Sequence, residues 1–215
     1  MTAGEEANVP EWCAAVAEQG VVAIVRERSG PAALERAMAL VDAGVRVVEV
    51  SLTTPDALPT ITALAAAAGD RALVGAGTVV DVDQARQAVA AGARFLVAPV
   101  LCEQVIAYAA ASGVGVLPGA ATPTEMLAAH RAGADLVKVF PATTWTPRAL
   151  ADVLVALPHL RLVPTGGVGL ADAPEWVRHG AVAVGIGSAL TAAPGRDLRG
   201  VVADLVGSLA AARYR

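Results

Sequence analysis

The sequence predicts an α/β fold: a single compact (β/α)8 barrel spanning residues 1–215, with an extra N-terminal helix. One repeated pattern indicates this fold. An Ala-rich stretch ends in a small residue and a glycine, and a β-branched run follows directly, at 42–50, 91–98, 112–117, 132–140 and 179–186. Glycine supplies the left-handed backbone that ends a helix, so each copy marks a helix-to-strand turn. Copies lie roughly 20 to 25 residues apart, with gaps filled at 68–69 and 157–158, which makes about eight strand–helix units.

The elements follow in order along the chain. We expect a short amphipathic helix over residues 9–19, ended by Gly20, and then the strands: 21–26, 45–51, 72–76, 94–98, 114–118, 135–140, 161–165 and 182–186. Strands that alternate with helices indicate a parallel sheet. An open doubly wound sheet is the competing architecture. The even repeat disfavours it, and residues 75–80 lack the third glycine of a dinucleotide-binding fingerprint.

Composition excludes several classes of function. The chain is 55% hydrophobic, yet Gly, Pro or charged residues interrupt its apolar runs before they could span a bilayer, so we expect no membrane partner. A net charge of -4 and 3% aromatic residues argue against nucleic acid as a partner. Cys13 and Cys102 belong to no metal or redox motif, and no secretory leader pattern opens the chain. We therefore expect a protein of the reducing cytoplasm.

The chain has a single lysine, Lys138, and it lies in the apolar run 135–140. Arginine could meet any need for surface charge, whereas only lysine carries an amine that burial can deprotonate. A neutral amine can attack a carbonyl and form a Schiff base. The alternative is a structural lysine whose ammonium reaches water at the strand end.

Polar residues and glycines gather where the expected strands end. In a barrel these ends form the active site. Side chains alternate along a strand, so Leu136, Lys138 and Phe140 should share the inward face, as should Val47, Glu49 and Ser51. The residues at these ends include Arg26, Glu49, Thr53, Thr78, Pro99, Lys138, Phe140, Thr165, Gly166, Gly167, Gly187 and Ser188.

Two of these features, Glu49 and the glycine turns, allow two interpretations each, and the histidines predict no site. Glu49 could act as an acid and base, or could form a structural ion pair with Arg26 or Arg46. The glycine turns at 164–168 and 185–188 fit a phosphate-binding site at the ends of the last two strands, or tight turns that bind no ligand. All three histidines fall on the helix-to-strand side, so we expect no metal site.

Several ordered motifs together resemble the class I aldolases that cleave 2-keto-3-deoxy-6-phosphogluconate (KDPG) and its galactonate epimer. The resemblance extends from Val21 to about Thr191 and is carried by residues 49–55, 74–79, 118–125, 138–141 and 164–168. It implies cleavage of a phosphorylated 2-keto-3-deoxy sugar acid to pyruvate and glyceraldehyde 3-phosphate without metal or organic cofactor. It also implies a homotrimer.

The resemblance assigns roles residue by residue. Lys138 matches the Schiff-base lysine, and Glu49 matches the general acid and base. The residues that match the pyruvate pocket are Thr78, Pro99 and Phe140, and those that match the phosphate end are Gly166, Gly167 and Ser188.

The chain departs from this family at Thr53. Many members carry at that position an arginine that holds the pyruvate carboxylate, and Arg26 is our candidate replacement. Thr165 resembles the gluconate enzymes, whereas residues 52–55 are nearer to galactonate-type relatives, so the epimer stays open, as does 4-hydroxy-2-oxoglutarate.

Two other functions remain compatible with the sequence. One is a phosphosugar isomerase or epimerase in which Glu49 transfers protons, and the other is a phosphate-ligand sensor without turnover. Neither of them forms a covalent intermediate with Lys138.

Overall fold

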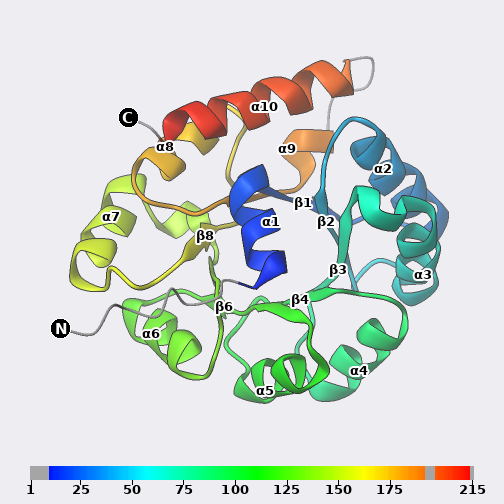
Figure 1. The fold of residues 1–215 in the computed structure, drawn as a ribbon, viewed down its shortest axis with the longest axis horizontal. Helices are drawn as coiled ribbons and strands as arrows, with labels where there is room; N and C mark the ends of the chain where they lie inside the picture. The colour runs from blue at the N-terminus through cyan, green and yellow to red at the C-terminus, as the bar shows by residue number, and fades with distance from the viewer. Residues whose placement is uncertain (1–9, 192–196, 214–215) are drawn as a thin grey trace.

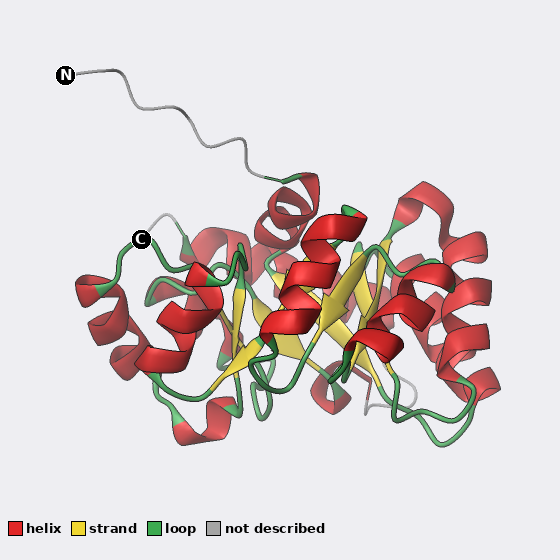
Figure 2. Cartoon of the chain, turned by 90° about the horizontal axis from the view of Figure 1, so that it is seen from below, coloured by secondary structure: helices red, strands yellow, loops and turns green. Residues whose placement is uncertain are grey.

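The computed structural model of the protein describes residues 10–191 and 197–213. Parallel strands form a curled sheet at the centre, and helices surround it (Figures 1 and 2). The strands are β1 Val21–Val25, β2 Val47–Ser51, β3 Leu73–Gly77, β4 Phe95–Val97, β5 Gly115–Leu117, β6 Gly119–Ala120, β7 Val137–Val139, β8 Leu162–Pro164 and β9 Val184–Ile186. The α-helices are α1 Glu11–Gln19, α2 Gly30–Asp42, α3 Ala57–Ala68, α4 Val82–Ala90, α5 Glu103–Ser112, α6 Pro123–Arg131, α7 Pro147–Ala156, α8 Ala173–Arg178, α9 Ser188–Thr191 and α10 Leu198–Ala212. Two 3₁₀ turns are η1 Gly69–Arg71 and η2 Ala142–Thr144.

The strands form one six-stranded sheet of order β5-β4-β3-β2-β1-β9 and one three-stranded sheet of order β6-β7-β8. Every neighbouring pair of strands in these sheets is parallel. An isolated parallel bridge between Thr165 and Gly185 joins the end of β8 to β9. Each predicted strand position therefore carries a strand, and the prediction of an α/β fold with a parallel sheet is confirmed.

The structure differs from the prediction after Pro118, where the expected strand 114–118 ends as β5 and a further short strand, β6, follows it. Proline has no N–H to donate to a neighbouring strand, so the ladder stops there. The carbonyl of Pro118 accepts from the Lys138 backbone N–H at 2.9 Å, while Gly119 N–H donates to Val100 O at 3.3 Å. The chain thus leaves one sheet and enters the other within two residues. The result is two sheets rather than one continuous eight-stranded sheet.

Glycines make the helix-to-strand turns, as predicted. Gly44, Gly92, Gly113, Gly133 and Gly180 follow α2, α4, α5, α6 and α8 with φ of 107°, 100°, 68°, 103° and 98°. Any other residue would be strained in this left-handed region. The repeat seen in the sequence is therefore a repeat of turn geometry.

The first helix, α1, lies across the ends of the strands at the centre of the molecule (Figure 1). Its Cys13 and Val16 are fully buried in an inner apolar cluster. Trp12 stacks on Phe95 of β4 with ring centroids 6.3 Å apart and an interplanar angle of 10°. The predicted helix is confirmed over Glu11–Gln19, and residue 9 lies outside the described residues.

Side chains alternate along the strands between this inner cluster and an outer core. Val47 of β2 and Leu136, just before β7, belong to the inner cluster, while Val137 and Val139 pack in the outer core. Two residues beyond Val47 and Leu136, the same inner face carries Glu49 and Lys138. The inner cluster consists of Cys13, Val16, Val22, Val47, Phe95, Val97, Leu117, Leu136, Val163 and Ala183.

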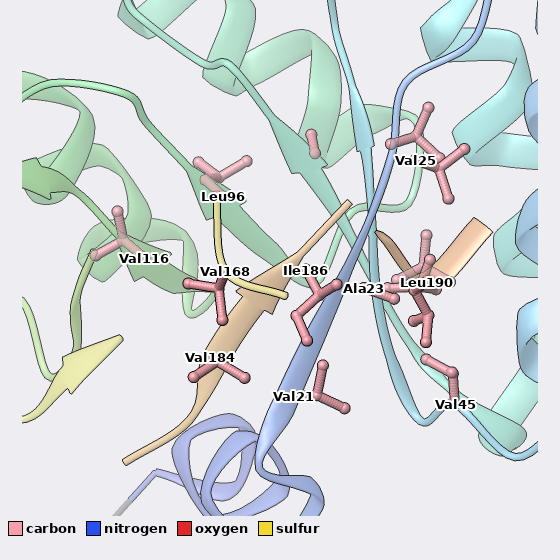
Figure 3. Close-up of a cluster of buried hydrophobic side chains, with 14 of the residues drawn as sticks. Val21, Ala23, Val25, Val45, Leu96, Val116, Val168, Val184, Ile186 and Leu190 are labelled. Carbon is pink, nitrogen blue, oxygen red and sulfur yellow. The ribbon is translucent and has the colours of Figure 1, made fainter. Parts of the chain in front are cut away.

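The outer core lies between the strands and the surrounding helices. Figure 3 shows part of it around β1 and β9, where Val21, Ala23, Val184 and Ile186 contribute buried side chains. Valine and alanine dominate these positions, which accounts for the high hydrophobic fraction of the sequence. Their burial contributes about 25 cal/mol for each Å² of apolar surface removed from water.

The last helix, α10, follows β9 and the short helix α9 in the chain. It packs against α8 and α2, and Arg199 donates to the carbonyl of Asp42 at 2.8 Å. A helix that could cross a membrane would need to be longer and more apolar than any in the described part of the chain.

Candidate active site

Lys138 lies in the middle of β7, where its side chain is 6% exposed. It pairs in register with Gly119 on one side and Val163 on the other. Its Nζ lies 4.8 Å from the ring centroid of Phe140. Burial lowers the pKa of Lys138 below its usual range; the charge of Glu49 raises it and that of Arg26 lowers it. The site therefore favours the neutral amine more than water does.

Glu49 lies on the inner face of β2 and is 3% exposed. Its Oε2 has no hydrogen-bond partner among the described residues. Burial raises the pKa of Glu49, while the positive charges of Lys138 and Arg26 lower it. A buried carboxyl with a free oxygen beside an amine can both take and give a proton.

The alternative role for Glu49, an ion pair with Arg26 or Arg46, finds no support. Arg46 instead pairs with Glu18 of α1 at 2.9 Å. Within the described residues Glu49 takes part in no ion pair. Its charge is thus set by burial and by the nearby positive charges of Lys138 and Arg26.

Gly77, the last residue of β3, makes room for the Glu49 carboxyl group. A Cβ at this position would lie 2.7 Å from Glu49 Oε1 and 2.9 Å from its Cδ. Gly77 was not among the predicted site residues. Its only signal was its position at a strand end.

We expect Gly77→Ala to lower any turnover (kcat) that depends on the Glu49 carboxyl group by about tenfold to a hundredfold, because a displacement of 1 Å in a reacting group can cost that much. Glu49 can swing away from the new methyl group, so the thermal unfolding temperature should fall only slightly. Gly207→Ala is the matched control, since a Cβ there meets nothing within 4 Å. It should leave kcat unchanged. A wild-type kcat for Gly77→Ala would show that the position of the Glu49 carboxyl group does not matter.

Three hydroxyl groups lie together where β2 and β3 end. Ser51 Oγ is 2.8 Å from Thr53 Oγ1 and 2.8 Å from Thr78 Oγ1. Thr78 has φ of 64°, an unusual conformation for a β-branched residue. The structure thus connects Thr53 and Thr78 through Ser51, which the sequence placed on the inward face of its strand but to which it assigned no role.

Phe140 connects Lys138 to the glycine turn after β8. A Cβ on Gly166 would lie 3.0 Å from the Phe140 ring, and one on Gly167 would lie 2.2 Å from Thr143 Cγ2. Both glycines have positive φ, 88° and 85°. The turn therefore packs directly on the residues that follow β7.

Pro99 lies on the other side of β7. A Cβ on Gly119, the partner of Lys138 in register, would lie 2.3 Å from the Pro99 carbonyl carbon. Pro99 is thus separated from Lys138 by one strand.

The exposed Arg26 directly follows β1, and the other predicted residues lie at the ends of β8 and β9. Thr165 is buried and its hydroxyl donates to the Val163 carbonyl at 3.2 Å. A Cβ on Gly185 would lie 2.3 Å from Thr165 Oγ1. Gly187 lies beside Ile24 of β1, and the exposed Ser188 begins α9. These residues line the rim between β8 and β1.

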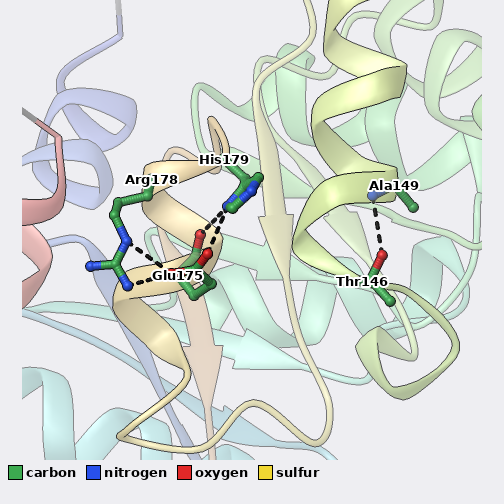
Figure 4. A network of polar contacts seen from close by, with 5 residues as sticks. All are labelled: Thr146, Ala149, Glu175, Arg178 and His179. Atoms are coloured by element: carbon green, nitrogen blue, oxygen red, sulfur yellow. Dashed lines mark hydrogen bonds and ion pairs between the residues drawn. The ribbon is translucent and has the colours of Figure 1, made fainter. Parts of the chain in front are cut away.

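The histidines lie away from Lys138. His179, at the end of α8, has its Nδ1 2.9 Å from the carbonyl oxygen of Glu175 and 3.4 Å from Glu175 Oε1 (Figure 4). The rings of His130 and His159 have centroids 4.9 Å apart. In residues 10–191 and 197–213, no three His, Cys, Asp or Glu side chains are grouped as a metal ion would require.

A cavity of about 460 Å³ lies at the opposite ends of the strands, beside α1. Trp12, Arg46, Arg71 and Arg94 are among its lining residues. Glu49 and Lys138 do not line it. The candidate site is therefore defined by the contacts around Lys138 and not by this cavity.

Comparison with known proteins identifies the family. The family model for the aldolases described as KDPG and KHG aldolase matches residues 13–201 of the chain. The chain belongs to this family. KDPG and KHG aldolases are lyases, and both Lys138 and Glu49 lie within the matched residues.

Two relatives in the family differ in their named substrates. The chain is 41% identical over 149 residues to a 2-dehydro-3-deoxy-phosphogluconate aldolase of Treponema pallidum, covering 68% of this chain and 70% of the relative. It is 34% identical over 171 residues to a 2-dehydro-3-deoxy-6-phosphogalactonate aldolase of Escherichia coli, covering 79% and 83%. Identity alone does not separate the two epimers.

Two solved structures share the fold. One is a 4-hydroxy-2-oxoglutarate aldolase/2-deydro-3-deoxyphosphogluconate aldolase from TTHB1, with a TM-score of 0.80, 34% identity, and coverage of 92% of this chain and 98% of that one. The other is a KDPG aldolase from Legionella pneumophila with pyruvate captured as a covalent carbinolamine intermediate. Its TM-score is 0.72 at 28% identity, with coverage of 92% and 96%.

Proposed function

We propose that the chain is a class I aldolase that cleaves KDPG or its galactonate epimer to pyruvate and glyceraldehyde 3-phosphate, with Lys138 as the Schiff-base residue. One observation carries the proposal: the only lysine is buried on an inward-facing strand position, beside a buried carboxyl group with an unpaired oxygen. The carbinolamine of pyruvate in the Legionella relative supports the same chemistry here.

The first half of the reaction forms the electron sink. The neutral Lys138 amine adds to the C2 carbonyl of the substrate, and loss of water from the carbinolamine gives a protonated imine. Glu49 transfers protons in these steps. Burial raises the pKa of Glu49 above its usual range, so its protonated form is easier to reach than that of a carboxyl group in water.

The second half breaks the carbon–carbon bond. Glu49 takes the proton of the C4 hydroxyl, the C3–C4 bond breaks, and its electron pair moves into the imine as glyceraldehyde 3-phosphate leaves. The resulting enamine is protonated at C3, and water hydrolyses the imine to pyruvate and the free amine. The water released in the first half balances the water consumed here.

A coupled assay of pyruvate release tests this function. We expect turnover with at least one of the two phosphorylated epimers, and weaker turnover with 4-hydroxy-2-oxoglutarate, which cannot use the glycine turns at Gly166 and Gly187. If none of the three substrates released pyruvate, the proposal would be contradicted. The isomerase and the sensor would then be the remaining functions for the protein.

Many family members bind the pyruvate carboxylate with an arginine at the position that Thr53 occupies here. We propose that Arg26 takes over this role. It is exposed at the end of β1, and its charge acts on both Glu49 and Lys138. We expect Arg26→Lys to raise the KM for the substrate about tenfold, because the planar pair of donors is lost while the charge is kept. Arg28→Lys, an exposed neighbour, is the matched control. An unchanged KM for Arg26→Lys would contradict this role.

We also propose finer features of architecture and assembly. The bridge at Thr165, together with the Val182 N–H that donates to Leu162 O at 3.0 Å, supports closure into an eight-stranded barrel in which β5 and β6 count as one strand. A homotrimer in the cytoplasm is proposed from the family resemblance. The exposed Val80 and Val100, on neighbouring strand-end loops, suit a subunit contact. Light scattering of the purified protein tests the assembly.

A further inference from the structure

Ser51 is the centre of a chain of three hydroxyl groups. It is the last residue of β2, is fully buried, and pairs in register with Gly77, the residue before Thr78. Its Oγ lies 2.8 Å from both Thr53 Oγ1 and Thr78 Oγ1, and it accepts the Thr53 backbone N–H at 3.4 Å. Ser51 therefore connects an exposed threonine of the site to a half-buried one.

A count of hydrogens gives this chain a direction. Each hydroxyl group carries one hydrogen, so three groups joined by two hydrogen bonds leave one hydrogen unused. Ser51 Oγ already accepts the Thr53 backbone N–H, so its second lone pair accepts from only one threonine and its own hydrogen goes to the other. The unused hydrogen is therefore at one end of the chain, and the other end offers only lone pairs. Ser51 can donate its one hydrogen to either Thr53 or Thr78. The threonine that accepts it keeps its own hydrogen free for a ligand.

Thr78 is the end of the chain that is next in sequence to the Glu49 carboxyl group's neighbour on β3. It follows Gly77, the residue that lies against the Glu49 carboxyl group, and it is held at φ of 64°. A β-branched residue leaves this region unless other contacts hold it there. The bond to Ser51 is such a contact.

We propose that Ser51 is a positioning residue that presents the free hydroxyl hydrogen of Thr78 to the carboxylate of the bound 2-oxo acid. The inference rests on the proposed function, which supplies that ligand. A carboxylate only accepts hydrogen bonds, so its binding selects the arrangement in which Thr53 donates to Ser51 and Ser51 donates to Thr78. Thr53 then donates to Ser51, at a position where many family members carry a charged arginine.

The test compares two carbonyl compounds in borohydride trapping on Lys138. Pyruvate carries a carboxylate, and hydroxyacetone offers a ketone without one. For Ser51→Ala we expect the half-saturating concentration of pyruvate to rise about tenfold, the scale of one lost hydrogen bond to a charged group. The half-saturating concentration of hydroxyacetone should stay as in the wild type.

Three further variants separate positioning from stability. Thr60→Val removes a buried hydroxyl of α3 that donates to Asp56 O at 2.8 Å, and should change neither value. Ser51→Cys keeps the size of the side chain with a weaker donor, and should give an intermediate effect even if Ser51→Ala fails to fold. Thr78→Val should match Ser51→Ala for pyruvate, and the double variant should be no worse than either single one.

The outcomes are distinct. Trapping of pyruvate by Ser51→Cys and Ser51→Ala at the wild-type concentration would overturn the role of Ser51, as would an equal loss for pyruvate and hydroxyacetone. If the wild-type protein traps neither compound, the aldolase proposal itself fails, and the role of Ser51 fails with it.

Discussion

Replacing Lys138 with arginine is expected to lower pyruvate release by a factor on the order of 10³ or more, because the covalent route is removed. The arginine guanidinium stays protonated at any pH that the fold tolerates, so it cannot attack a carbonyl. The positive charge beside Glu49 is kept. The measurement is kcat in the coupled assay with the preferred epimer.

The arginine variant also carries its own control for folding. Its circular dichroism spectrum should match that of the wild type, because the substituted side chain still enters the same inner face of β7. Activity above a tenth of the wild-type value in a folded Lys138→Arg protein would contradict the proposed role of the lysine.

Glu49→Gln is expected to lower kcat by about 10²- to 10⁴-fold, the usual contribution of a positioned acid or base. The amide fills the space beside Gly77 but can no longer take the C4 hydroxyl proton. Pyruvate should still be trapped on Lys138, although more slowly. A kcat within threefold of the wild type would contradict the role of Glu49 as a base.

The same variant should move the acid limb of the pH profile for pyruvate trapping. In the folded protein burial lowers the pKa of Lys138 from its ordinary 10.5, and the Glu49 charge partly restores it. Without that charge the Lys138 pKa should fall further, so the fraction of neutral amine at a given pH should rise. The acid limb therefore shifts to lower pH in Glu49→Gln, and a shift to higher pH would contradict the electrostatic account.

Most of the fold follows from the sequence because the repeat is local. Gly44, Gly92 and Gly133 each end a helix through their own backbone conformation, and period-two alternation placed Val47 and Leu136 on the inner face. The change from one sheet to the other at Pro118 could not be predicted from the sequence. A proline at the end of a predicted strand does not say which sheet the chain joins next, since that depends on hydrogen bonds to Val100 and Lys138.

Some residues of the site could be predicted from the sequence and others could not. Lys138 was visible because it is the only lysine, and Glu49 because alternation turns it inward. Ser51 and Gly77 were placed at strand ends but received no role, because their roles depend on contacts between β2 and β3. The Ser51 hydroxyl bonds to Thr78, and the missing Cβ of Gly77 makes room for the Glu49 carboxyl group. The partner of Arg46 was likewise set by the packing of α1, which brings Glu18 to it.

The most direct test of Schiff-base chemistry is reduction of the wild-type protein with borohydride in the presence of pyruvate, followed by intact mass and a peptide map. One lysine makes the result easy to assign, because the α-amino group is the only other primary amine. We expect one reduced pyruvate adduct on the peptide that contains Lys138, and none there in Lys138→Arg. A folded wild-type protein that gains no adduct on this peptide would contradict the proposed mechanism.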